Sequence, residues 1–247
     1  MSNAKKPKKN RLDEWLMQSG FVSDAKAAFI VVTEGRVFVD GQKAVSPAQE
    51  FPETAKIEVR GRRKYVGRGA EKLAGAMEKF QAEADGKICA DIGSATGGFT
   101  QVLLENGAKK VYAIDTAKGK LDLKLREDPR VEVMEGTDVR DIKKLQDTPK
   151  LVTIDVSLVS LRNILLAVMR LMPQGGEVVA LFKPQYETRD PKMLKAGIVT
   201  DDIYREALFQ DFIAWAREVG WKVMQTMVSP IRGGEGNVEY LIHLKRL

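Results

Sequence analysis

The sequence predicts an α/β protein with two parts, a small α+β domain and then a doubly wound parallel sheet that ends in an antiparallel hairpin. Three observations carry this prediction. Apolar segments alternate with helical ones after residue 69, a glycine-rich turn joins a strand to a helix at residues 91–100, and no helix separates the last two strands. A chain of 247 residues is long enough for one large domain and one small one.

The N-terminal part begins with lysine-rich residues 1–10, which we interpret as a basic, flexible arm. Residues 11–60 then predict a domain that is too small for an enzyme core but large enough for a binding module. Residues 61–68 predict a linker whose charge suits a nucleic-acid backbone, with a solvated face as the alternative. The expected elements are helices from Leu12 and over 25–34, an N-cap at Ser23-Asp24, strands over 36–39 and 57–59, and a hairpin turn at Asp40-Gly41.

The second part, residues 69–247, alternates strands with helices, and this pattern predicts the parallel sheet. Its final two strands should pair as a hairpin at one edge. The expected strands are 87–90, 111–114, 131–134, 151–154, 177–182, 221–228 and 238–244, and the expected helices are 70–80, 99–106, 161–171 and 204–219.

Composition limits the class of protein. The net charge of +6 indicates an anionic partner. Cys89 is the only cysteine and His243 the only histidine, so we expect neither a disulfide nor a histidine-ligated metal site. No apolar run approaches the ~18 residues that span a membrane, and the N-terminus lacks an apolar signal core. These features favour a cytoplasmic protein that has no metal and no membrane contact.

The glycine-rich turn predicts a ligand site, because glycines let a ligand approach the backbone near a helix N-terminus. It lacks the Gly-x-Gly-x-x-Gly pattern of dinucleotide sites, since three non-glycines follow Gly93. Its Asp-x-Gly-x-x-x-Gly-Gly pattern resembles the first motif of S-adenosylmethionine (SAM) methyltransferases, and a structural turn is the alternative. The resemblance implies cofactor contacts at Asp91, Gly93, Ser94, Gly97, Gly98 and Phe99.

Polar residues follow the predicted strands. Ligands of open parallel sheets bind beyond the carboxyl ends of the strands. Asp115 lies about 20 residues past the turn, the spacing at which an acid reaches a ribose, and Asp138 is placed to contact the adenine. Each acid alone could be a helix cap. Together they predict a cofactor site at the edge formed by Asp91, Asp115, Asp138, Asp155 and Lys183.

A set of residues in the N-terminal domain matches a known pattern: Arg11-Leu12-Asp13, Leu16, Gly20, Ser23, Ala27, Ile30, Gly35, Val37, Val39, Asp40 and Gly41. With these residues the domain resembles the S-four-type RNA-binding domain. Asp24 and Asp40 depart from that family, where Arg and Asn are usual, which predicts weaker or differently directed RNA binding; a purely structural domain is the alternative. The resemblance implies RNA contacts, for which the candidates are Arg11, Lys26, Arg36, Arg62, Arg63, Lys64 and Arg68.

Five segments carry a second resemblance: residues 65–73, 91–100, 155–157, 183–187 and 236–240. With them the chain resembles the FtsJ-like ribose 2′-O-methyltransferases, and more closely the TlyA/hemolysin A family of ribosomal RNA methyltransferases, over nearly its whole length after the basic arm. The resemblance implies a Rossmann-like methyltransferase sheet, SAM as cofactor, ribosomal RNA or subunits as partner, and methyl transfer to a cytidine 2′-hydroxyl in 16S or 23S RNA. Gly67 and Leu158 depart from the family, and Leu158 could alter the wall of the catalytic pocket. The implied catalytic residues are Lys72, Asp155, Lys183 and Glu239.

Lys183 is the expected central residue, because a ribose hydroxyl must lose its proton to become a good nucleophile. A lysine accepts a proton only where its surroundings lower its pKa from about 10.4. Otherwise it stays charged and stabilises the developing alkoxide. We favour the base, with Asp155 holding Lys183 in place, Lys72 opposing the protonated form of Lys183 and Glu239 favouring it. The sequence leaves both the base and the electrostatic role open. A salt-bridge cluster without a catalytic role is the alternative.

Three competing functions come from other classes. An RNA-binding, ribosome-associated factor without catalysis is opposed by the intact set of four catalytic candidates. A cytolysin, suggested by the hemolysin label, is opposed by the missing apolar segment. A nicotinamide dehydrogenase is opposed by the missing Gly-x-Gly pattern and by the terminal hairpin.

Overall fold

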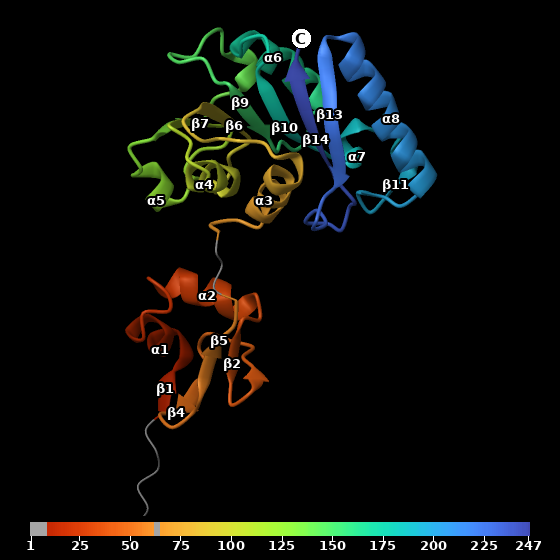
Figure 1. The fold of residues 1–247 in the computed structure, drawn as a ribbon. Coiled ribbons are helices and arrows are strands. Elements are labelled where there is room, and N and C mark those ends of the chain that lie inside the picture. The colour runs from red at the N-terminus through yellow and green to blue at the C-terminus, as the bar shows by residue number, and fades with distance from the viewer. Residues whose placement is uncertain (1–8, 62–64) are drawn as a thin grey trace, which may run out of the picture. The chain divides into compact units, whose positions relative to one another are not determined.

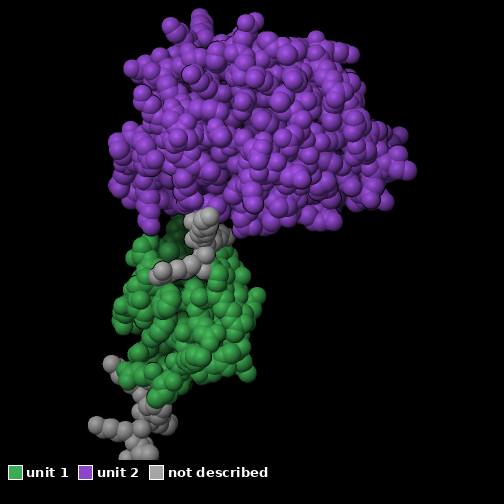
Figure 2. All heavy atoms as spheres, in the orientation of Figure 1, with its two compact units in different colours: residues 1–64 green, residues 65–247 purple. Residues whose placement is uncertain are grey.

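The computed structural model describes residues 9–61 and 65–247. The contacts divide the chain into two compact units, residues 1–64 and 65–247 (Figures 1 and 2). We describe each unit by itself. Across the described residues, no helix is long and apolar enough to cross a membrane.

The smaller unit packs two helices, α1 (Leu12–Gln18) and α2 (Ala25–Thr33), on a three-stranded antiparallel sheet in the order β3-β2-β5. Asp24 caps α2 as predicted, because its Oδ1 accepts a hydrogen bond from the Ala27 amide at 2.8 Å. The Asp40-Gly41 turn joins two strands as expected, with positive φ at both residues. The strands are β2 (Val37–Val39), β3 (Gln42–Lys43) and β5 (Ile57–Val59).

The predicted basic arm is too long at its C-terminal end. Lys9–Arg11 form β1, which pairs antiparallel with β4 (Glu50–Pro52). Neither strand was predicted, because charged residues and a proline give no apolar alternation. The two strands pair through their backbones, and Phe51 of β4 packs against the core of the unit. Residues 1–8 of the arm lie outside the described residues.

The larger unit contains a seven-stranded sheet in the order β13-β14-β10-β9-β6-β7-β8 (Figure 1). The five strands from β6 to β10 are parallel, and β14 pairs antiparallel with both β10 and β13, which confirms the predicted fold. The chain reverses its direction of travel across the sheet between β6 and β9, which is where ligands of such sheets bind. The strands are β6 (Ile88–Ile92), β7 (Lys110–Asp115), β8 (Val131–Glu135), β9 (Leu151–Ile154), β10 (Glu177–Phe182), β13 (Trp221–Val228) and β14 (Tyr240–Arg246).

Helices cover both faces of this sheet. One apolar core includes residues of α6 and α8, and the other includes residues of α3 and α4, so the sheet is doubly wound. The short elements α5, α7, β11 and β12 were not predicted, because two to four residues give no readable periodicity. The bounds are α3 (Gly69–Phe80), α4 (Gly98–Glu105), α5 (Leu123–Arg126), α6 (Leu161–Leu171), α7 (Pro184–Glu187), β11 (Leu194–Lys195), β12 (Ile198–Val199) and α8 (Asp202–Glu218).

The end of the predicted linker packs with the larger unit. The Val66 amide donates a hydrogen bond to Gln101 Oε1 at 2.8 Å, and Tyr65 and Val66 pack against the core beneath α3 and α4. The structure therefore assigns residues 65–68, which we expected in the linker, to the larger unit.

Candidate active site

A pocket of about 450 Å³ opens beyond the carboxyl ends of β6, β7 and β9, at the edge where the sequence predicted a site. Its volume falls within the usual range for small-ligand sites. A smaller pocket of about 120 Å³ adjoins it, since both are lined by Gly93, Ala95 and Asp155. The predicted cofactor residues divide between them: Asp115 and Asp138 line the larger, Ser94, Gly98 and Phe99 line the smaller, and Gly93 lines both.

Two glycines of the turn allow close packing around these pockets. Gly93 has a φ of +81°, and a Cβ there would lie 2.2 Å from the Asp155 carbonyl oxygen. Gly97 has a φ of +94° and precedes α4, where a Cβ would lie 2.2 Å from Leu125 Cδ1. Gly97 lines neither pocket and instead permits the turn to pack against α5.

Asp91 lies behind the turn rather than in the pocket. It is fully buried inside β6 and lines neither cavity. Its carboxylate accepts hydrogen bonds from the hydroxyls of Thr100 at 2.7 Å and Thr153 at 3.0 Å. Burial raises the pKa of Asp91 to about 7, although both hydrogen bonds act in the opposite direction. Asp91 therefore ties β6 to β9 and α4, and the geometry does not support a direct cofactor contact.

Asp115 ends β7 and faces the larger pocket. Its two oxygens accept hydrogen bonds from the amides of Ala95 at 2.8 Å and Ala117 at 2.7 Å. Each carboxylate oxygen can accept a second hydrogen bond, so the side chain is fixed in orientation and can still accept from a ligand hydroxyl.

Asp138 lies three residues beyond β8 and lines the same pocket. Its carboxylate pairs with the Arg140 guanidinium at 2.5 Å, and this interaction lowers the pKa of Asp138. Arg140 also lines the pocket, although the sequence analysis did not select it. Its position two residues after a predicted site acid was the available signal.

The four catalytic candidates form two ion pairs. Lys183 directly follows β10, and its Nζ lies 2.6 Å from Asp155 Oδ1 and donates a hydrogen bond to Ser157 Oγ at 3.2 Å. Lys72, from α3, lies with its Nζ 2.5 Å from Glu239 Oε2, and both side chains are buried.

The sheet register brings these two pairs to one edge. The antiparallel ladder between β10 and β14 ends with Phe182 opposite Tyr240, so the next residues along, Lys183 and Glu239, follow on facing strands. The Lys72–Glu239 pairing differs from the expectation that both residues act on Lys183, because Glu239 neutralises Lys72 directly.

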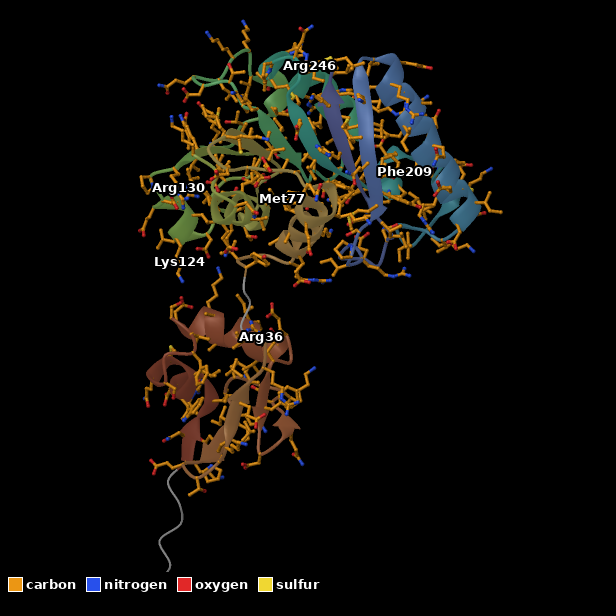
Figure 3. All side chains as sticks on the ribbon, in the orientation of Figure 1. Arg36, Met77, Lys124, Arg130, Phe209 and Arg246 are labelled. Carbon is orange, nitrogen blue, oxygen red and sulfur yellow. The ribbon has the colours of Figure 1, made fainter. Side chains whose placement is uncertain are left out.

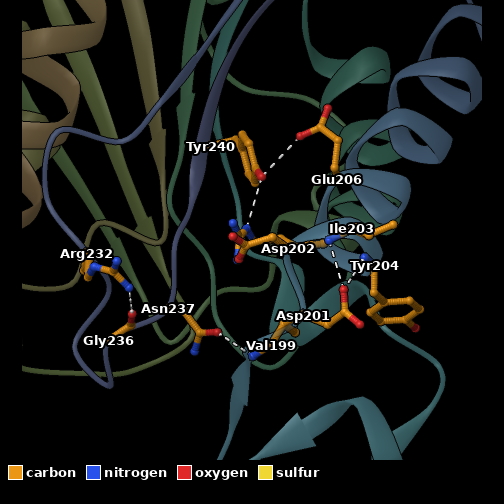
Figure 4. Close-up of polar contacts among 11 residues, drawn as sticks. Val199, Asp201, Asp202, Ile203, Tyr204, Glu206, Arg232, Gly236, Asn237 and Tyr240 are labelled. Atoms are coloured by element: carbon orange, nitrogen blue, oxygen red, sulfur yellow. Dashed lines mark hydrogen bonds and ion pairs between the residues drawn. The ribbon is translucent and has the colours of Figure 1, made fainter.

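Asn237, which was not among the predicted site residues, positions Glu239. Asn237 is buried, and its side chain accepts a hydrogen bond from the Val199 amide at 3.1 Å (Figure 4). It also donates a hydrogen bond to the Gly197 carbonyl at 3.0 Å. These bonds fix the connection before β14 to the β11–β12 hairpin. The Arg232 guanidinium donates to the Gly236 carbonyl within the same connection. Asn237 lies in the family-matching segment 236–240, which was the signal available.

Some of the predicted RNA-contact residues already bind other groups of the protein. Arg11 pairs with Asp13 at 2.7 Å, and Arg36 donates to the backbone carbonyl of Arg60. Lys26 is exposed on α2. Arg62, Arg63 and Lys64 lie outside the described residues, and Arg68 lines the smaller pocket of the larger unit.

The two residues that depart from the S-four-type pattern have structural roles. Asp24 caps α2, and Asp40 Oδ1 accepts a hydrogen bond from the Lys56 amide at 2.8 Å.

Within residues 9–61 and 65–247, no cluster of side chains could hold a metal ion.

Comparisons with known proteins agree with this geometry. A family model described as FtsJ-like methyltransferase matches residues 65–246. Hemolysin A of Brachyspira hyodysenteriae is 39% identical over 236 residues, which cover 94% of this chain and 98% of the relative. TlyA of Mycobacterium tuberculosis, named a 16S/23S rRNA (cytidine-2′-O)-methyltransferase, is 36% identical over 239 residues, which cover 95% of this chain and 89% of the relative.

Solved structures show the same similarity. A candidate hemolysin from Streptococcus thermophilus superposes with a TM-score of 0.76 at 36% identity, covering 96% of this chain and 88% of that one. A SAM-dependent methyltransferase from Listeria monocytogenes shares the fold alone, with a TM-score of 0.55 at 16% identity over 73% of this chain and 98% of that one.

The buried ion pair generates a stability prediction. Lys72→Met leaves the Glu239 carboxylate buried without its counter-charge, so the free energy of unfolding should fall by about 3–5 kcal/mol. The double variant Lys72→Met/Glu239→Leu removes both charges, so its free energy of unfolding should fall by markedly less. Denaturant unfolding followed by tryptophan fluorescence measures both values, and equal losses in the two variants would contradict the pairing.

Proposed function

The chain belongs to the FtsJ-like methyltransferase family and uses SAM as its cofactor, and from this premise we propose that it methylates a ribose 2′-hydroxyl of ribosomal RNA. The names of the relatives support the substrate, because TlyA of Mycobacterium tuberculosis and TlyA of Campylobacter jejuni are named rRNA (cytidine-2′-O)-methyltransferases. We infer that the target here is also a cytidine of 16S or 23S ribosomal RNA. Membership of this family is incompatible with the dehydrogenase alternative.

The pocket residues fit SAM. Asp115 would accept hydrogen bonds from the ribose hydroxyls of the cofactor, and Asp138 with Arg140 lines the part of the pocket assigned to adenine. The Ser94 hydroxyl is buried and has no hydrogen-bond partner among the described residues. A polar atom at the methionine end of SAM would supply the missing hydrogen bond. Bound SAM supplies an electrophilic methyl carbon, and its sulfur retains the electron pair of the broken bond.

The single observation that carries the catalytic proposal is the position of Lys183. Its ammonium is held by Asp155 and Ser157, both of which line the larger pocket. Its pairing with a carboxylate suits the electrostatic role, which we propose in place of the base that the sequence suggested. Lys183 would orient the 2′-hydroxyl and stabilise the negative charge that develops on its oxygen. The hydroxyl proton leaves to water as the oxygen–carbon bond forms.

Substitution of Lys183 tests this role. Lys183→Ala should retain SAM and RNA binding while single-turnover methyl transfer falls at least ~10²-fold, the loss typical of one removed electrostatic donor. Lys183→Arg keeps a permanent positive charge and should retain more transfer than the alanine variant. Near-normal transfer by Lys183→Ala would remove Lys183 from the mechanism. Equal inactivity of both variants would favour the base.

We also propose that the smaller unit binds the RNA. Its resemblance to an RNA-binding domain supports this, as does the exposed face of α2. Lys26, Phe29 and Ile30 recur on that face at helical spacing, and Phe29 is 55% exposed. An exposed aromatic beside a cation can stack on an unpaired base.

Removal of that aromatic ring should weaken RNA binding. Phe29→Ala should cost about 1–3 kcal/mol of binding to purified ribosomal RNA, the value of one base–aromatic stack. Val45→Ala is the matched control, because Val45 is also highly exposed in the same unit but lies outside α2. Fluorescence anisotropy gives both affinities. A Phe29→Ala affinity equal to that of the control would exclude α2 as the contact face.

A further inference from the structure

Three lysines mark the loop that follows β7. Lys118 and Lys120 lie in the loop, and Lys124 lies in the short helix α5 that ends it; Figure 3 shows Lys124 extending outward from the unit. All three are exposed. None has a hydrogen bond or an ion pair from its side chain within residues 9–61 and 65–247. We call these three residues the lysine rim.

The rim is built on a rigid loop. Glu135, the last residue of β8, accepts hydrogen bonds from the amides of Gly119 at 2.8 Å, Lys120 at 2.8 Å and Leu121 at 3.0 Å. It also pairs with Arg126 at 2.8 Å. The Leu121 amide, the Arg126 guanidinium and the Gly119 amide lower the pKa of Glu135 to about 2, so the carboxylate stays charged at neutral pH. Because Glu135 occupies these three amides, an anion at this part of the loop would meet the lysine side chains rather than the amides.

The loop is continuous with the wall of the larger pocket. Asp115 and Thr116, which begin the loop, both line that pocket. The Asp122 amide donates to the Thr96 carbonyl at 3.2 Å, which ties the loop to the glycine-rich turn. The alkyl chain of Lys118 lies against Gly136, where a Cβ would come within 2.3 Å of Lys118 Cε. The loop that carries the rim therefore adjoins the wall of the pocket.

We propose that the lysine rim binds the phosphates of the RNA strand that flanks the target nucleotide, and this inference rests on the proposed function. A strand whose ribose enters the pocket must pass its mouth. Asp138 and Asp155 in the pocket wall are paired with Arg140 and Lys183, but Asp115 has no ion pair among the described residues, so cations at the mouth offset its repulsion of phosphates. Lysine is a common point-charge ligand for phosphate. The larger unit thus contributes an RNA contact of its own, besides the contact proposed for α2.

The test neutralises the rim in the full-length chain. Lys118→Gln/Lys120→Gln/Lys124→Gln is compared with Lys109→Gln/Lys150→Gln/Lys222→Gln, a control with the same loss of charge. The control lysines are exposed and lie at the opposite end of the strands from the pocket. Lys109 and Lys150 directly precede β7 and β9, and Lys222 is the second residue of β13. Binding to purified ribosomal RNA is measured from low to moderate salt, and SAM binding is measured by calorimetry.

The rim variant should bind RNA at least ~10-fold more weakly at low salt, and its slope of log affinity against log salt should fall by about 2–3. The control slope should fall by less than about 1, and both variants should bind SAM normally. At saturating RNA the rim variant should approach the wild-type rate of methyl transfer, while its KM for RNA rises.

Equal slopes in the rim and control variants would overturn the proposal, as would loss of SAM binding in the rim variant. A rim variant that loses binding to phosphatidylserine vesicles but keeps its RNA affinity would assign the rim to a lipid surface and also overturn it. RNA binding is measured independently of methyl transfer, so a failure of the lysine-rim proposal can be distinguished from a failure of the proposed function. A wild-type chain that binds RNA through the rim but transfers no methyl group would overturn only the proposed function.

Discussion

The antiparallel pairing of β14 with β10 is the constraint on which the active site depends. β10 ends at Phe182 and β14 begins opposite it at Tyr240, so the residues just outside the ladder, Lys183 and Glu239, meet at one edge of the sheet. A shift of one residue in this register would turn one of them to the other face. The terminal hairpin that distinguishes this sheet from a purely parallel one therefore brings together the residues that we propose for catalysis. It joins residues that are separated by 56 positions in the sequence.

Charge in this site is balanced locally. Each lysine has its own carboxylate, Lys183 with Asp155 and Lys72 with Glu239. Only the second pair is fully buried, and burial of an ion pair contributes little net stability. Its value for function is orientation, since Asn237 fixes the chain two residues before Glu239. The Lys183 ammonium is held by two residues that line the pocket, Asp155 and Ser157, which is an arrangement suited to stabilising negative charge on a bound oxygen.

The strands and long helices were readable from the sequence, because their apolar patterns are set by burial; the segments 151–154, 161–171 and 177–182 have the predicted bounds. The residues at strand ends could also be predicted, since topology alone brings them to one edge of the sheet. The partners within each ion pair could not be predicted. Nothing in the sequence says that Glu239 pairs with Lys72, or that Asp91 turns inward to two threonines, because such choices depend on side-chain packing between distant segments. β1 was missed because its residues, Lys9–Arg11, show no apolar alternation.

The central claim is that this chain methylates a cytidine ribose of ribosomal RNA. Mass spectrometry of nuclease-digested RNA from ribosomal subunits, incubated with SAM with and without the protein, tests it most directly. The account predicts a new 2′-O-methylcytidine in 16S or 23S RNA that appears only with the active protein. A methyl group on a base atom, or ribosomal RNA left unmodified while another class of RNA is methylated, would contradict it.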